Sequence, residues 1–64
     1  MLIFEEVIIT KKSGGSEYRA WLRCWAGLSE NAVAVVETFT GVVECYSTAD
    51  FYIRFTGSFK NQGD

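Results

Sequence analysis

The chain has 64 residues, and its six Lys and Arg against eight Asp and Glu give a formal net charge of -2. This length predicts a single domain spanning residues 1–64, and a hydrophobic content of 48% indicates a globular chain rather than a disordered one. The charge excludes the strongly basic footprint of most nucleic-acid-binding proteins, and the absence of His excludes His-based acid–base catalysis.

The first predicted element is a β-hairpin of residues 2–12 and 17–26. Both segments are rich in β-branched and aromatic residues. The Gly14-Gly15 dipeptide between them tolerates the positive φ angles of a tight two-residue turn. A turn at this dipeptide matches charges and apolar side chains across the two strands, which favours the resulting register. The predicted pairs are Lys12 with Glu17, Glu6 with Arg23, Val7 with Leu22 and Ile8 with Trp21.

The second predicted element is a helix over residues 29–40. Ser29 is a suitable N-cap, Gly41 is a suitable C′ residue, and apolar side chains recur at helical spacing between them. The Val and Thr residues of this segment oppose a helix, because β-branched side chains favour strands. A strand, however, would place the carboxylate of Glu37 between two apolar side chains of the same face. We therefore predict a helix.

Two further strands are expected at residues 42–46 and 51–56, with a turn at residues 47–50. The order is then ββαββ. It predicts an α+β fold, in which an N-terminal and a C-terminal hairpin form a small antiparallel sheet with one helix on one face. If residues 29–40 form a strand instead, five strands at near-regular spacing predict an all-β small barrel of SH3-like or OB-like type.

Strand alternation predicts one unusual surface, which we call the Arg/Trp face. Two Arg and two Trp residues share one side of the second strand. A single short helix cannot bury them, because the guanidinium groups would need partners, so this side should be open. Trp, Tyr and Arg carry much of the binding energy in protein interfaces. The predicted binding residues are Arg19, Trp21, Arg23 and Trp25, together with Phe4, Ile8, Tyr52 and Arg54 on the neighbouring strands.

The Arg/Trp face predicts a small non-catalytic interaction protein that binds a protein partner or a second copy of itself. A simpler interpretation is a surface that covers itself, with Arg stems lying over the indoles. The alternative function is binding of single-stranded nucleic acid by sheet aromatics and arginines. In size, acidity, aromatic content and lack of a catalytic residue set, the chain resembles the small inhibitors that bacteriophages encode against host machinery, anti-CRISPR proteins among them. This resemblance of type implies an inhibitor and assigns no role to any residue.

The composition also predicts which kinds of site the protein lacks. Cys24 and Cys45 have no CxxC neighbour, and a zinc site would need carboxylates because the chain has no His. Both lie among apolar residues, so we expect two buried, reduced thiols that react slowly. We predict no cofactor, metal, small-molecule substrate or enzymatic activity. The longest apolar run is too short to cross a bilayer, and acids follow Phe4 without a preceding basic region, which predicts a cytoplasmic chain that avoids membranes.

Overall fold

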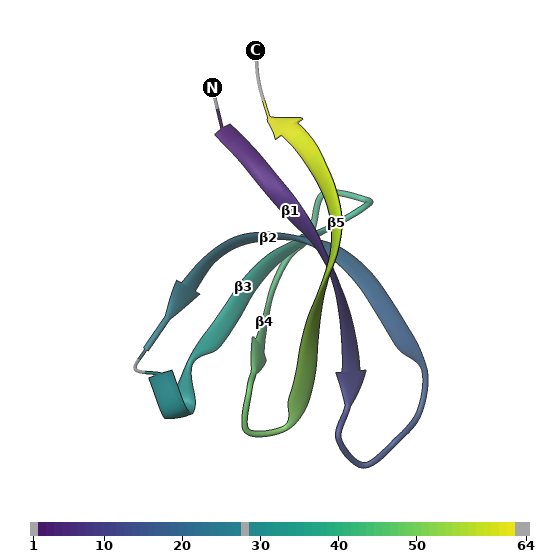
Figure 1. The fold of residues 1–64 in the computed structure, drawn as a ribbon, viewed down its shortest axis with the longest axis vertical. Helices are drawn as coiled ribbons and strands as arrows, with labels where there is room; N and C mark the ends of the chain where they lie inside the picture. Colours follow the sequence, from purple (N-terminus) through teal and green to yellow (C-terminus); the bar gives the residue numbers. More distant parts are fainter. Residues whose placement is uncertain (1, 28, 63–64) are drawn as a thin grey trace.

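The computed structural model describes residues 2–27 and 29–62, and these form one five-stranded antiparallel sheet (Figure 1). The elements are β1 (Leu2–Lys11), β2 (Glu17–Ala26), the 3-10 turn η1 (Ser29–Asn31), β3 (Val33–Thr38), β4 (Val43–Ser47) and β5 (Phe51–Gln62). The described part of the chain is therefore all-β. No helix within it is long and apolar enough to cross a membrane.

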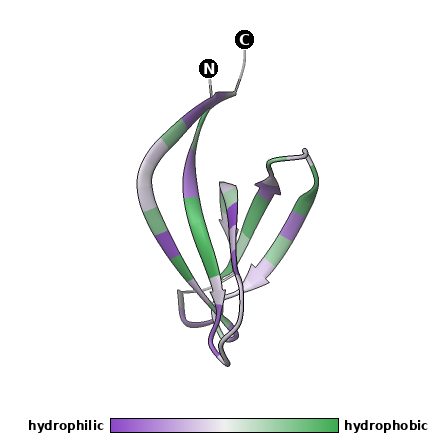
Figure 2. Ribbon diagram, turned by 90° about the vertical axis from the view of Figure 1, so that its right-hand side faces the viewer, coloured by the Kyte–Doolittle hydropathy of each residue, from purple (hydrophilic) through white to green (hydrophobic). Residues whose placement is uncertain are grey.

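The strand order is β4-β3-β2-β1-β5. The first four strands form a meander, and β5 returns to pair with β1 at the centre of the molecule (Figure 1). Strands β4 and β5 are therefore the two edges of the sheet. The ladder between β1 and β2 ends at Glu5 and Leu22, and beyond these residues the two strands diverge (Figure 1). Figure 2 shows hydrophobic and hydrophilic residues alternating along the strands, as expected where a strand has two different faces.

The hydrophobic core lies on one face of the sheet, which we call the core face. Its centre consists of five side chains that are at most 2% exposed: Val7, Ile9, Ala20, Ala34 and Val36. Leu22, Tyr46, Phe51 and Ile53 pack against this centre. The opposite face, which we call the outer face, is marked by the cross-strand row Glu6, Trp21, Glu37 and Val43. Extensive contacts between strands join neighbours in the sheet. The sheet also curls around the core, because the Tyr46 ring of the edge strand β4 contacts the Phe51 ring of the other edge strand β5, with centroids 4.9 Å apart.

The predicted helix over residues 29–40 is wrong, and the α+β fold with ββαββ order is wrong with it. Residues 33–38 form β3, which pairs with β2 and β4. The strand propensity of the β-branched residues outweighs the helical spacing of the apolar side chains. The Glu37 carboxylate, which was the argument against a strand, accepts a hydrogen bond from Arg23 Nη1 at 2.7 Å. Gly41 lies in the β3–β4 turn at a φ of +90° and donates its N–H to the Thr38 carbonyl. The structure belongs to the all-β class of the alternative prediction, but its sheet keeps β4 and β5 as two edges and is not a closed barrel.

The first hairpin has nearly the predicted strands but a different register. Glu6 pairs with Trp21 rather than with Arg23. The shift moves the pairing by two residues on one strand, so each paired side chain keeps its predicted face. The N–H of Lys12 donates to the carbonyl of Asp50 in the β4–β5 turn at 2.9 Å. The N–H of Gly14 donates to the carbonyl of Lys11 at 3.0 Å, so the chain turns directly after β1 and the loop is longer than the Gly-Gly dipeptide.

Candidate functional site

A β-bulge in β2 divides the predicted Arg/Trp face between the two faces of the sheet. The β2–β3 register pairs Leu22 with Val36, Cys24 with Val35 and Trp25 with Ala34. Arg23 is therefore an extra residue on β2, and the side-chain alternation shifts beyond it. Trp21 and Arg23 stay on the outer face. Trp25 lies on the core face, where it is 45% exposed.

Trp21 is the centre of the aromatic cluster that remains on the outer face. Its ring stacks on Phe39 with centroids 5.2 Å apart and an interplanar angle of 18°. The Nζ atom of Lys60 lies 5.7 Å from the same ring. The cross-strand row places Glu37 beside Trp21 and Val43 beside Glu37. We call this cluster the Trp21 patch: Trp21 itself, which is half-buried, and Phe39, Val42 and Val43, which expose 57%, 52% and 55% of their surfaces.

The three arginine side chains all have carboxylate partners within the chain. The closest nitrogen–oxygen distances are 2.7 Å for Arg23 and Glu37, 3.2 Å for Arg54 and Glu17, and 3.8 Å for Arg19 and Glu6. The Arg23 guanidinium carbon also lies 5.3 Å from the Phe4 ring centre. Because each guanidinium is paired, the outer face presents no open track of unpaired arginines of the kind that nucleic-acid phosphates require.

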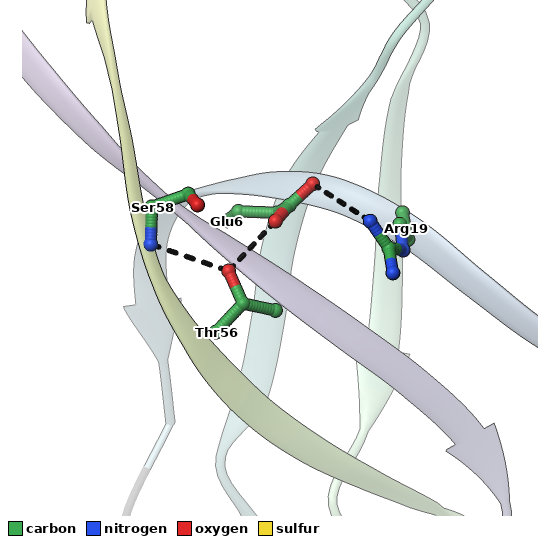
Figure 3. Close-up of polar contacts among 4 residues, drawn as sticks. All are labelled: Glu6, Arg19, Thr56 and Ser58. Carbon is green, nitrogen blue, oxygen red and sulfur yellow. Dashed lines mark hydrogen bonds and ion pairs between the residues drawn. The ribbon is translucent and has the colours of Figure 1, made fainter.

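Glu6 is a buried carboxylate beside this cluster. Its Oε1 atom accepts a hydrogen bond from Thr56 Oγ1 at 2.7 Å, and its Oε2 atom faces Arg19 (Figure 3). Thr56 Oγ1 in turn accepts the N–H of Ser58 at 3.3 Å. A bulge in β5, with Gly57 at a φ of +89°, positions Thr56 for this contact. Both carboxylate oxygens have partners, so Glu6 stabilises the β1–β5 pair rather than offering a reactive group.

The remaining predicted binding residues differ in their accessibility. Phe4 is only 6% exposed, so a partner cannot reach most of it. Ile8 is half-buried on the outer face, where Arg19 and Arg54 flank it from the two neighbouring strands. Tyr52 is 58% exposed and lies at the β5 edge, away from Trp21. Arg19 and Arg23 therefore lie on either side of Trp21 along the outer face of β2, whereas Tyr52 lies outside this cluster.

The exposed members of the Trp21 patch are not among the predicted binding residues. The predicted helix contains Phe39, and the predicted strand over residues 42–46 begins with the two valines that follow Gly41. A signal was nevertheless present. Turns are normally polar, whereas Phe39, Val42 and Val43 place bulky apolar side chains on either side of a turn glycine.

The prediction of two buried thiols is wrong, because Cys24 and Cys45 are both exposed. Each pairs with Val35, one from either side, so both lie on the outer face. Two strand spacings separate them, about 9.5 Å. Disulfides join residues with Cα atoms roughly 4.4–6.8 Å apart, so the two thiols cannot bond within one chain without backbone movement.

Tyr46 on the core face has a raised pKa. The Tyr46 hydroxyl donates to Glu44 Oε1 at 2.7 Å, and its ring contacts Phe51 edge-on with centroids 4.9 Å apart. The hydrogen bond to Glu44, together with burial and the negative charge of Glu44, raises the pKa of Tyr46 to about 12. The phenol therefore stays neutral at physiological pH and acts as a structural donor.

Comparison of the chain with protein-family models, with curated proteins and with solved structures finds no match. Its function is therefore inferred from the side chains described above. Within residues 2–27 and 29–62, no group of three or more His, Cys, Asp or Glu side chains is placed to hold a metal ion.

Proposed function

We propose that the protein is a non-catalytic interaction module that binds a protein surface through the Trp21 patch and the adjoining arginines. One observation carries the proposal: half-exposed apolar side chains lie directly beside Trp21 and the Arg23–Glu37 ion pair on the outer face of the sheet. Contiguous exposed apolar side chains mark interaction sites. Trp and Arg are the residues in which binding energy concentrates.

The charges of this surface favour a protein over nucleic acid. Phosphate binding needs cations that are free to replace counterions, but the arginine charges are neutralised by Glu6, Glu17 and Glu37. Base stacking also needs an open aromatic face, whereas the Trp21 ring is stacked on Phe39 and half-buried. A protein partner needs neither feature. Binding without chemistry is also how a small inhibitor of the type suggested by the sequence would act.

The proposal is tested by capture with the biotinylated protein from a soluble cell extract. Phe39→Ser removes an exposed side chain of the patch, and Tyr18→Ser removes a ring of similar exposure, 51%, on the core face. We expect a captured protein whose binding untagged wild type competes, which Tyr18→Ser retains and which Phe39→Ser weakens at least about tenfold. An equal loss of captured protein in both variants would contradict the proposal. Capture abolished by nuclease, with an affinity that falls steeply with salt, would favour the nucleic-acid alternative.

A further inference from the structure

We infer that the free edge of β5 is a second interaction surface, and that its partner is an extended protein segment in which apolar and acidic residues alternate. The segment adds a strand to the sheet beside β5, a mode of binding in which backbone hydrogen bonds supply the affinity. The inference goes beyond the proposed function, because it uses the edge of the sheet rather than the Trp21 patch.

The backbone of β5 pairs on one side only. Within the described sheet β5 ends the strand order, and its single neighbour is β1. The second half of β5 rises beside β1 and away from β4 (Figure 1), and every residue from Arg54 to Phe59 is exposed. The unpaired N–H and C=O groups of an edge strand are matched by the backbone of another extended chain. The edge therefore favours a strand as its partner.

The features that usually protect an edge strand are few in β5. Protected edges are short, contain Pro or carry charged side chains directed at the approaching strand. β5 has 12 residues, and the chain contains no Pro. Its two basic side chains reach inward across β1 to β2, where Arg54 Nη2 lies 3.2 Å from Glu17 and Lys60 Nζ lies 5.7 Å from the Trp21 ring. The bulge at Gly57 bends the edge, but no charge is directed away from the sheet to block it.

The aromatic side chains of β5 favour apolar residues on one face of the added strand. Phe55 pairs with Val7 and Phe59 pairs with Glu5, so both rings lie on the core face. They are 48% and 62% exposed. A strand beside β5 places every second side chain next to these rings, and apolar side chains at those positions remove the rings from water.

The other face of β5 favours acidic residues. β5 contains Arg54 and Lys60 and no acidic residue. Lys12 Nζ lies 5.2 Å from the ring of Tyr52 on the same face, and Lys12 has no carboxylate partner within the described part of the chain. Acidic side chains of the added strand complement these cations. A second β5 fits less well, because its own basic residues would lie on this face.

The inference is tested with a fluorescein-labelled peptide of about ten alternating Val and Glu residues, whose binding is followed by fluorescence polarisation. We expect it to bind at least about tenfold more tightly than the same peptide with Lys in place of Glu. N-methylation of several successive central residues removes the backbone donors on both edges of the peptide, and we expect a loss of similar size. Equal binding of the Lys peptide would overturn the acidic preference, and equal binding of the methylated peptide would overturn strand addition.

Two variants and hydrogen exchange locate the binding site. Phe55→Ser removes a ring beside the edge and should weaken peptide binding at least about tenfold. Tyr18→Ser is the matched control, because Tyr18 is 51% exposed on the same face but lies on β2. Circular dichroism shows whether both variants keep the sheet. In wild type, the peptide should protect amides of β5 from exchange. Protection of β4 instead, or equal weakening by the two folded variants, would overturn the assigned edge.

The outcomes separate this edge from the Trp21 patch. No binding of the Val/Glu peptide up to about 1 mM would overturn the inference, whereas Phe39-dependent capture from the extract would still support the proposed function. Peptide binding without such capture would support the β5 edge alone. Protection of β5 amides that rises with protein concentration in the absence of peptide would show that a second copy occupies the edge, and would overturn the stated partner.

Discussion

Glu6 illustrates how one residue is stabilised by its contacts across the sheet. Burying a carboxylate is costly unless its oxygens have partners. Thr56 supplies a hydrogen bond and Arg19 supplies a positive charge, and both come from strands adjacent to β1. The contact with Thr56 joins residues separated by 50 positions. Glu6 therefore favours one register of β1 against β5.

We expect Thr56→Val to destabilise the protein by about 1–3 kcal/mol, because it leaves Glu6 Oε1 without its donor. The measurement is urea denaturation followed by circular dichroism. Thr10→Val is the control, since Thr10 is half-buried on the same face and its hydroxyl makes no hydrogen bond among the described residues. Equal destabilisation by the two variants would show that the Glu6 contact has no special role.

The Tyr46 phenol should ionise only at strongly alkaline pH. Its pKa is raised from 10.0 to about 12, mainly by the hydrogen bond to Glu44, so folding favours the protonated phenol. The stabilisation is fully present below pH 10 and is lost as pH rises from about 10 to about 12. Tyrosinate absorbance against pH measures this step. Tyr46→Phe should remove the ionisation near pH 12 and Glu44→Ala should lower the pKa of Tyr46, whereas a wild-type titration without an ionisation near pH 12 would contradict the assignment.

At the scale of the elements, two bulges determine which side chains meet. The bulge at Arg23 places Trp25 on the core face and moves Cys24 to the outer face. The bulge at Gly57 positions Thr56 for its bond with Glu6. At each bulge one strand gains residues relative to its neighbour, one on β2 and two on β5, and side chains are re-aimed there.

Gly57→Ala tests the second bulge. A Cβ atom at this position would meet nothing within 4 Å, so the cost comes from the backbone φ of +89°. We expect a loss of about 1–2 kcal/mol in the free energy of unfolding. Ser58→Ala is the control in urea denaturation, because the described hydrogen bond of Ser58 uses its backbone N–H. A loss as large in Ser58→Ala would contradict a backbone origin.

The sequence is sufficient to predict the strands of the first hairpin, the approximate positions of β4 and β5, and the faces of most residues before the bulges. These predictions hold because alternation is a local property of a strand. The register is not a property of the hairpin alone, because β1 also pairs with β5 from Leu2 to Lys11. A turn signal in the hairpin carries no information about that pairing.

The helix error and the divided Arg/Trp face have one cause. The Glu37 side chain appeared to exclude a strand, but Arg23 on the neighbouring strand pairs with it. The bulge that contains Arg23 also moves Trp25 away from Trp21. Neither effect is readable from one strand alone, because each depends on how β2 lies against β3.

At the scale of the whole molecule, the sheet leaves both thiols exposed on the face opposite the core. We expect Cys24 and Cys45 to react with a thiol reagent at low protein concentration nearly as fast as in the urea-unfolded chain, because both are exposed. Reaction rates measured by absorbance, with the unfolded chain as control, test this. Native rates far below the unfolded ones at all concentrations would mean that the thiols are covered.

The position of β5 beside β1 has a consequence for how the protein is made. The ribosome releases β1 first, yet β1 gains its second neighbour only when β5 has left the exit tunnel. Until then, one long edge of the nascent meander has no partner, and Phe51 and Ile53 are missing from the core. Sheets that depend on such distant pairings fold in roughly milliseconds to seconds. The native sheet therefore forms only after β5 has been synthesised, and an unfinished chain exposes an edge that can pair with other nascent chains.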